Sequence, residues 1–487
     1  MASKFRSLDS YEATISYGYR LLPFKFTALD ESEYALTNYV GQVTLLDLDT
    51  LANFVHHTLP SNSEAYKALK SRHFLLDSDS DVAIDLLGLK MRTRLARLKE
   101  FTSLHMFVVS LRCEHSCPYC QVSRQSDDRK AFDMSTATAD KALGLVFRSP
   151  SSSIKIEFQG GEPMLNFELV QYIVERAEAI NRTEHRDLQF VIATNLAMVT
   201  DDILTFCKDH EILISTSLDG PPDLHNQNRP RSGRNSYEKA VEGIQRARDA
   251  LGRDRVSALM TTTQASLSRG REIIDEYLRL GFEGIFLRPL SPYGFAIKTR
   301  TYAAYDTDQW LTFYFDGLDY IMELNRGGVP FREHYAAIIL GKMLTPFGTG
   351  YVDLRSPAGI GVAAIVYNYD GDVYASDESR MLAEMGDKTF RIGNVHENSW
   401  EEIMTSDSLL TPLAESFAES APMCSDCAFE PFCGADPVFH HATQGDYLGH
   451  KPTSAFCRRN MAIFRRLIIM LRDDESARSI FLQWANS

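Results

Sequence analysis

Cysteine is scarce in this chain, because its 487 residues include only eight. Seven of the eight fall into two groups, which indicates metal ligands and argues against the disulfide framework of small secreted domains. The remaining one, Cys207, lies in a helical pattern and is expected to be a buried helix residue.

Long apolar runs are also absent. No stretch approaches the roughly 18 consecutive apolar residues that a membrane helix needs. Residues 1–16 are polar and lack the apolar core of a secretory signal. We therefore expect no membrane span and a cytoplasmic location. A sizeable core is still expected, because 44% of the residues are hydrophobic and the length corresponds to about three domains.

Positive charge is in deficit, with 51 Lys and Arg against 65 Asp and Glu and a formal net charge of −14. General nucleic-acid binders depend on neutralising phosphates, so this balance argues against nucleic acid as a partner. It says little about a peptide or a small molecule.

The first cysteine group has the spacing C-x3-C-x2-C and consists of Cys113, Cys117 and Cys120. Three thiolates so spaced can hold one iron–sulfur cluster, for which thiolates are the usual ligands. A cubane cluster takes four ligands, so a triplet without a fourth cysteine nearby leaves one iron open for a substrate or cofactor. The alternative is zinc, with a distant fourth ligand such as His115.

With Tyr119 before its last cysteine, the triplet resembles the signature of radical S-adenosylmethionine (radical SAM) enzymes. Gly160, Gly161 and Glu162 follow an apolar run and resemble the family's motif for the methionine amino group of the cofactor. Glycines permit close approach, and a carboxylate can bind the ammonium. The resemblance implies a [4Fe–4S] cluster that reductively cleaves S-adenosylmethionine to a 5'-deoxyadenosyl radical.

Between about residues 100 and 300, apolar β-rich runs alternate with helix-period stretches. The expected strands are residues 105–111, 154–159, 188–194, 212–218, 255–262 and 284–288. Such units imply parallel strands, and six are fewer than the eight of a closed barrel. We predict an α/β fold, a partial (β/α)6 TIM-like barrel, with its site at the carboxyl ends of the strands.

Four regions are expected along the chain. They are an N-terminal module at 1–95, the radical SAM core at 100–300, a helical connection at 301–345 and a cysteine-rich domain at 346–487.

Other polar residues lie at predicted strand ends. The segment 217–220 resembles one that contacts the cofactor's ribose and carboxylate in radical SAM peptide maturases, which implies roles for Ser217 and Asp219. Asn195, Arg229 and Arg288 likewise match positions that face cofactor or substrate. Each has a structural alternative, since Asn195 can close a turn, Asp219 can cap a helix, and the arginines can form ion pairs.

The second cysteine group resembles the auxiliary-cluster (SPASM) domain of peptide-modifying members. Relatives with two auxiliary clusters carry further cysteines where Ser376 and Asp436 stand here, so we predict one auxiliary [4Fe–4S] cluster, with structural zinc as the alternative. Asp377 matches a carboxylate that deprotonates the substrate in sulfatase-maturing relatives. The four predicted ligands are Cys424, Cys427, Cys433 and Cys457.

Residues 1–95 contain no cysteine and resemble a small winged-helix module that holds a leader peptide as an added strand. The alternative is a capping domain over the open barrel. The start at 19–24, the module and the reduced cysteine set most resemble the HxsB family of His-Xaa-Ser peptide system maturases.

This resemblance implies a small ribosomal peptide as substrate, an electron donor such as flavodoxin or ferredoxin, and a second radical SAM maturase as partner. Two rivals stay open, a sulfatase-maturase-like protein oxidase and a zinc-bound scaffold without activity.

Overall fold

The computed structural model describes residues 18–79 and 82–486. The polar segment 1–16, considered above for targeting, lies outside these residues. Within the described residues, no helix has both the length and the apolarity needed to cross a bilayer.

An eight-stranded sheet forms the centre of the protein, in the order β10-β9-β8-β7-β6-β13-β14-β15. Its first five strands are parallel neighbours. On β6 the side chains of both faces are buried, whereas on β7, β9 and β10 buried residues alternate with exposed or half-buried ones. The five strands are β6 (Leu104–Ser110), β7 (Ser153–Gly160), β8 (Asp187–Thr194), β9 (Leu213–Ser217) and β10 (Val256–Leu259).

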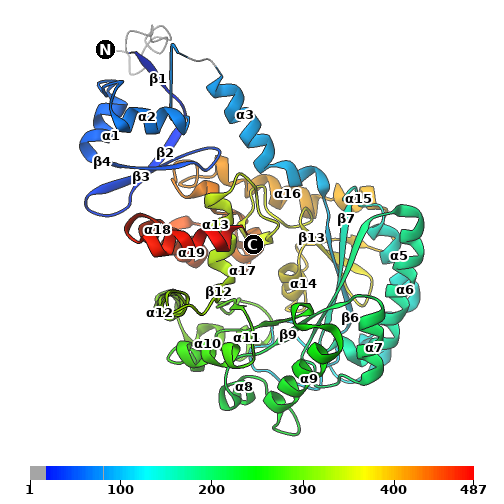
Figure 1. Ribbon diagram of the computed structural model, residues 1–487. Coiled ribbons are helices and arrows are strands. Elements are labelled where there is room, and N and C mark those ends of the chain that lie inside the picture. The colour runs from blue at the N-terminus through cyan, green and yellow to red at the C-terminus, as the bar shows by residue number, and fades with distance from the viewer. Residues whose placement is uncertain (1–17, 80–81, 487) are drawn as a thin grey trace.

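Helices connect these strands and lie along the outer side of the sheet (Figure 1). They begin where the sequence supplies caps: the side chains of Ser135 and Thr200 accept hydrogen bonds from the first turns of α5 and α7. Cys207 in α7 is fully buried, as expected. The α/β partial TIM-like barrel is thus confirmed. Its helices are α5 (Thr136–Val146), α6 (Phe167–Glu184), α7 (Asp201–Asp209), α8 (Pro222–Asn228), α9 (Ser236–Leu251) and α10 (Gly270–Arg279).

The sixth expected strand differs from its prediction. Only β11 (Gly284–Ile285) is a strand, and it pairs with β12 (Arg332–Glu333) in a separate two-stranded sheet. The reason lies at Leu287, whose backbone N–H donates to the Glu333 carboxylate at 3.1 Å instead of to a strand. The chain still runs beside the end of β10, because Thr262 N donates to Arg288 O at 2.9 Å.

The opposite edge of the large sheet is completed by the C-terminal part of the chain. Strand β13 (Ala364–Tyr367) runs parallel to β6, and β14 (Asp372–Tyr374) and β15 (Arg391–Asn394) follow antiparallel. The remaining longer helices are α12 (Thr307–Arg326), α13 (His334–Leu344), α14 (Asp377–Ala383), α15 (Trp400–Met404), α16 (Asp407–Glu415), α17 (Pro437–Gln444), α18 (Ala455–Asp473) and α19 (Glu475–Ala485), and the short ones are α4 (Arg129–Phe132) and α11 (Phe295–Lys298).

The N-terminal module has its own small core, in which Phe54, Leu69 and Phe74 are fully buried. Gly41, at a φ of +75°, makes the turn between two antiparallel strands. Helix α3 then leads from the module to the barrel (Figure 1). The module contains β1 (Tyr19–Leu21), β2 (Phe24–Ala28), β3 (Glu33–Asn38), β4 (Val43–Asp47), α1 (Leu48–Val55), α2 (Glu64–Ser71) and β5 (Leu75–Asp77), and α3 spans Ala83–Arg94.

Candidate functional site

The main cavity, of about 270 Å³, opens at the carboxyl ends of the barrel strands. Two further predicted residues, Glu162 and Asp219, are buried behind its wall with 1% and 0% of their surface exposed. The sequence-predicted residues that line the cavity are Cys113, Cys117, Cys120, Gly160, Gly161, Asn195, Ser217, Arg229, Arg288 and Asp377.

The glycine pair lets two strand ends meet closely. A Cβ on Gly160, whose φ is +153°, would be 1.9 Å from the carbonyl oxygen of Ser110. A Cβ on Gly161 would be 2.2 Å from that of Arg112. Side chains at these two positions would separate the end of β7 from the start of the cysteine loop. Arg112 also forms a paired contact with Asp133, with both N···O distances at 2.8 Å, which anchors the loop to the core.

Glu162 accepts three hydrogen bonds from the chain. The donors are Thr194 Oγ1 at 2.6 Å, Asn195 N at 2.9 Å and Met164 N at 3.1 Å. Burial raises the pKa of Glu162 to about 7, and the Glu114 carboxyl adds to the rise. A neighbouring cation would therefore be strongly favoured at this carboxylate.

Asp219 joins two other elements and does not cap α8, whose first turn has no side-chain cap. Tyr119 Oη donates to Asp219 Oδ2 at 2.5 Å, and Arg229 Nε donates to the same oxygen at 3.1 Å. The Arg229 guanidinium also lies 5.5 Å from the centre of the Tyr119 ring. Asp219 thus fixes Tyr119, the residue before the third cysteine, while Arg229 both forms an ion pair and lines the cavity.

Two further predicted residues, Asn195 and Arg288, make a structural contact and also line the main cavity. Asn195 Oδ1 accepts from Ala197 N at 2.8 Å and so closes a turn, yet Asn195 also lines the main cavity. Arg288 Nη2 lies 3.9 Å from Glu378 Oε1 and lines the cavity as well.

The three thiols of the triplet face one cavity and present soft donor atoms from one short loop. Burial raises the pKa of Cys117 to about 12, against the attraction of Arg229. Buried thiolates need a compensating cation, which a metal cluster provides. The donor set therefore fits an iron–sulfur cluster.

His115 is already engaged in hydrogen bonds on both ring nitrogens. Its Nδ1 lies 2.9 Å from Glu114 Oε1, and its Nε2 lies 2.7 Å from Ser236 Oγ. The ligand atoms of Cys113, Glu114 and His115 do come within 4.8 Å of one another. A zinc ion at His115 would have to displace one of these hydrogen bonds.

Asp377 is the first residue of α14, which the side chain of Ser376 caps. Its carboxylate lines the main cavity, and within residues 18–79 and 82–486 its Oδ1 has no hydrogen-bond partner. Arg380 Nε lies 3.6 Å from this oxygen. Burial raises the pKa of Asp377 to about 6 against the attraction of Arg380. An ionised carboxylate at a cavity wall can accept a proton from a bound molecule.

The second cysteine group lies at the start of α18 and in the loop that precedes α17. Cys457 stands in the first turn of α18, where its N–H donates to Ser454 Oγ at 3.2 Å. Burial raises the pKa of Cys457 to about 12, and Cys433, Cys424 and Cys427 add to the rise, so the four thiols lie in one another's electrostatic range.

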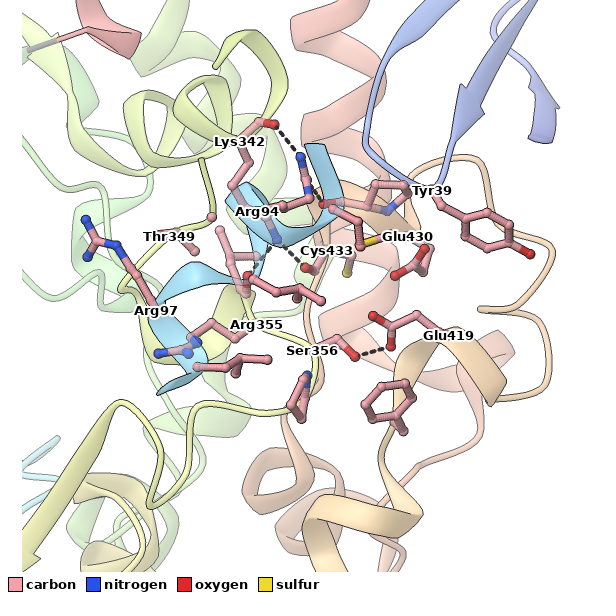
Figure 2. Close-up of a pocket in the computed structure, with 18 residues that line it drawn as sticks. Tyr39, Arg94, Arg97, Lys342, Thr349, Arg355, Ser356, Glu419, Glu430 and Cys433 are labelled. Atoms are coloured by element: carbon pink, nitrogen blue, oxygen red, sulfur yellow. Dashed lines mark hydrogen bonds between the residues drawn. The ribbon is translucent and has the colours of Figure 1, made fainter. Parts of the chain in front are cut away.

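The N-terminal module packs directly on this cysteine loop. Lys25 Nζ lies 2.8 Å from Glu430 Oε2, and each side chain is 6% exposed. Thr37 Oγ1 donates to Ala428 O at 2.6 Å. Arg94, at the end of α3, donates to Pro431 O. Figure 2 shows Arg94 among the residues that line the cavity at this junction. This junction cavity, of about 260 Å³, is lined by Tyr39 of the module, by α3 and residues 342–357, and by Glu430 and Cys433 of the loop.

One segment of the chain holds the cysteine triplet, the Gly160–Gly161 pair and the parallel strands, and this segment matches a known protein family. Residues 107–265 match the family model described as the radical SAM superfamily. The chain belongs to the radical SAM superfamily. The matched segment contains the triplet and the Gly160–Glu162 motif.

Two relatives show how far the similarity extends. An uncharacterized protein of Methanothermobacter thermautotrophicus is 30% identical over 194 residues, which are 38% of this chain and 67% of that protein. The cysteine-type anaerobic sulfatase-maturating enzyme of Clostridium perfringens is 22% identical over 340 residues, 66% of this chain and 84% of that enzyme.

Two solved structures share the fold. The sulfatase-maturating enzyme anSMEcpe with bound AdoMet and a peptide has a TM-score of 0.62 at 18% identity, covering 79% of this chain and 99% of that one. SuiB of Streptococcus suis bound to its precursor peptide SuiA has a TM-score of 0.53 at 13% identity, covering 91% of this chain and 99% of that one.

Sequence reasoning missed two residues at or near the main cavity of this superfamily member. Glu157 lines the main cavity from β7, and burial raises its pKa. Residues 154–158 alternate apolar and charged side chains, and Glu157 is the one carboxylate among them. Arg380, 1% exposed, lies behind the cavity wall, and its local signal was the three-residue spacing from Asp377 on one helix.

Proposed function

We propose that this protein is a radical SAM enzyme that modifies a ribosomally made peptide. The observation that carries the proposal is that Cys113, Cys117 and Cys120 line the same cavity as the Gly160–Gly161 cradle and Asp377. When bound at these thiolates, a [4Fe–4S] cluster would supply the electron that cleaves S-adenosylmethionine to a 5'-deoxyadenosyl radical.

The residues of the chain would bind and orient the cofactor. Gly160 and Gly161 leave room for its close approach, and Glu162 provides the carboxylate for its ammonium group. Asn195, Ser217 and Arg229 offer polar groups along the other strand ends, with Asp219 holding Arg229 in place.

Asp377 would take a proton from the substrate. Asp377 lines the main cavity, and Arg288 lines the same cavity. Arg380, buried 3.6 Å away, would stabilise the carboxylate form between turnovers.

The cysteine-rich domain at 346–487 would hold one auxiliary [4Fe–4S] cluster through Cys424, Cys427, Cys433 and Cys457. Four protein thiolates saturate a cluster, so this site would accept an electron or stabilise structure without binding substrate. Structural zinc is the alternative, because four thiolates also suit zinc.

The N-terminal module at 1–95 would hold the leader of the peptide. Its three-stranded sheet, in the order β2-β3-β4, has two edge strands, and Phe26 on β2 is 51% exposed. An extended leader can add to such an edge. SuiB, which shares the fold, was solved with its precursor peptide, which supports a peptide substrate here.

The specific substrate we propose is a His-Xaa-Ser peptide, as for the HxsB family. The enzyme would act in the cytoplasm, where thiols stay reduced, with flavodoxin or ferredoxin as electron donor and a second radical SAM maturase as partner. A sulfatase serine or cysteine is the second candidate, favoured by the 22% identity to the Clostridium perfringens enzyme.

Anaerobic reconstitution tests the proposal. Iron, sulfide and zinc are measured together with reductive cleavage of S-adenosylmethionine to 5'-deoxyadenosine. About eight irons with cleavage supports two clusters, and about four irons plus zinc assigns the C-terminal site to zinc. No iron and no cleavage refutes the proposal. Mass spectrometry after incubation with a His-Xaa-Ser peptide and with a sulfatase peptide then separates the two candidate substrates.

A further inference from the structure

A second cavity, of about 40 Å³, adjoins the main cavity and is named here the inner cavity. Arg288 lines both cavities and forms their shared wall. The first two residues of α14 divide between them, because Asp377 lines the main cavity and Glu378 lines the inner one. The inner cavity therefore lies next to the place where a substrate would react.

Charges of both signs line the inner cavity. Three carboxyl groups, of Asp353, Glu378 and Asp436, face it together with the guanidinium groups of Arg288 and Arg459. For an ion of either sign, attraction to one set of groups is opposed by repulsion from the other, so the lining gives a full charge little net stabilisation. The lining therefore favours a neutral group that both donates and accepts hydrogen bonds.

Tyr293 lines this cavity, and its hydroxyl is buried. The residue is only 1% exposed, and in the part of the chain that the structure describes its Oη makes no hydrogen bond. Its neighbours do make such bonds: Asp436 Oδ1 accepts from Phe439 N at 2.9 Å, and Tyr335 Oη donates to Asn460 Oδ1 at 2.7 Å. Leaving a buried hydroxyl unpaired is costly, so Tyr293 is suited to a bound partner.

The size of the inner cavity limits its occupant. A single water needs roughly 10–15 Å³ by this measure, so the cavity has room for about three waters. That space fits the polar end of a side chain, such as an amide, a hydroxyl or an imidazole, and excludes a whole residue.

We propose that the inner cavity is a specificity pocket that takes a neutral, hydrogen-bonding side-chain end of the peptide substrate through Tyr293. The inference rests on the proposed function, because the occupant belongs to the peptide whose reacting residue enters the main cavity. The side chain in the inner cavity is thus a second position of the peptide, distinct from the residue that reacts.

The test uses small probes, because they require no turnover. The reconstituted protein is titrated at pH 8 with acetamide, imidazole, acetate and guanidinium, and binding is followed by saturation-transfer NMR. Acetamide and imidazole are expected to bind, and Tyr293→Phe is expected to weaken both about fivefold through loss of one hydrogen bond. Tyr320→Phe is the matched control, because the Tyr320 hydroxyl donates to Asp275 on the surface and should not affect the probes.

Equal probe binding by wild type and Tyr293→Phe, or tighter binding of acetate or guanidinium, overturns the proposal. Should Tyr293→Phe not fold, wild-type crystals soaked in acetamide decide: density for acetamide beside the Tyr293 hydroxyl supports the pocket, and ordered water alone refutes it. Cleavage of S-adenosylmethionine by the wild-type protein without peptide tests the proposed function separately, so the two failures are distinguishable.

Discussion

Lys25 and Glu430 connect the N-terminal module to the C-terminal cysteine loop inside the protein. The two residues are 405 positions apart, their charged atoms are 2.8 Å apart, and both side chains are 6% exposed. Removing one partner leaves the other charge buried without a counter-ion, which costs about 3–5 kcal/mol. We expect Lys25→Met to lower the free energy of unfolding by that amount.

A double-mutant cycle isolates the pair. Glu430→Gln alone should cost a similar amount, whereas the double variant removes both charges and should recover most of the loss. Lys67→Met is the matched control, because Lys67 and Glu64 are also 2.8 Å apart but are 61% and 91% exposed. That exposed pair should contribute less than about 1 kcal/mol.

Urea titration of each variant, followed by circular dichroism, measures the changes in free energy of unfolding. The reasoning would be refuted by a loss below about 1 kcal/mol in Lys25→Met, or by single effects that simply add in the double variant. Iron content after reconstitution is a second measurement, since loosening the loop should reduce metal bound by the C-terminal thiols.

Three further predictions concern the main cavity. Cys117→Ala should abolish cleavage of S-adenosylmethionine, whereas Cys427→Ala should spare some of it; equal loss in both would mean that the second site is needed for folding. Gly160→Ala should lower affinity for S-adenosylmethionine in equilibrium dialysis at least about tenfold, because its Cβ would lie 1.9 Å from a backbone oxygen. Gly88→Ala, where the described neighbours leave 4 Å free, should leave that affinity intact. Peptide modification should speed up as pH rises through about 6, because Asp377 accepts protons only when ionised. Asp377→Asn should slow it about 100-fold or more and remove this pH dependence, and an unchanged pH–rate profile would contradict the role.

The barrel could be predicted from sequence because its signal is local. Apolar residues at successive or alternate positions marked five strands, and these became β6 to β10. The sixth run has the same local pattern, but the Glu333 carboxylate takes the hydrogen bond of Leu287. The pairing of β13 with β6 brings Ala364 beside Leu104, and no local pattern encodes so distant a contact.

The candidate site divides in the same way. The cysteine triplet and the glycine pair are short motifs whose spacing is visible in the sequence. Asp219 looked like a helix cap because Asp favours that position, yet Tyr119 and Arg229 bind it instead. The inner cavity could not be predicted, since its walls come from segments between Phe286 and Arg459.

The contact between the module and the cysteine loop also sets an order of events during synthesis. Lys25 leaves the ribosome 405 residues before Glu430. At roughly 5–20 residues per second, the folded module waits about 20 to 80 seconds for its docking surface. Throughout that interval Lys25 is hydrated, and its charge becomes buried only when the last third of the chain arrives. The C-terminal cysteine loop therefore completes its packing only by docking onto a module that was folded well before the loop was made.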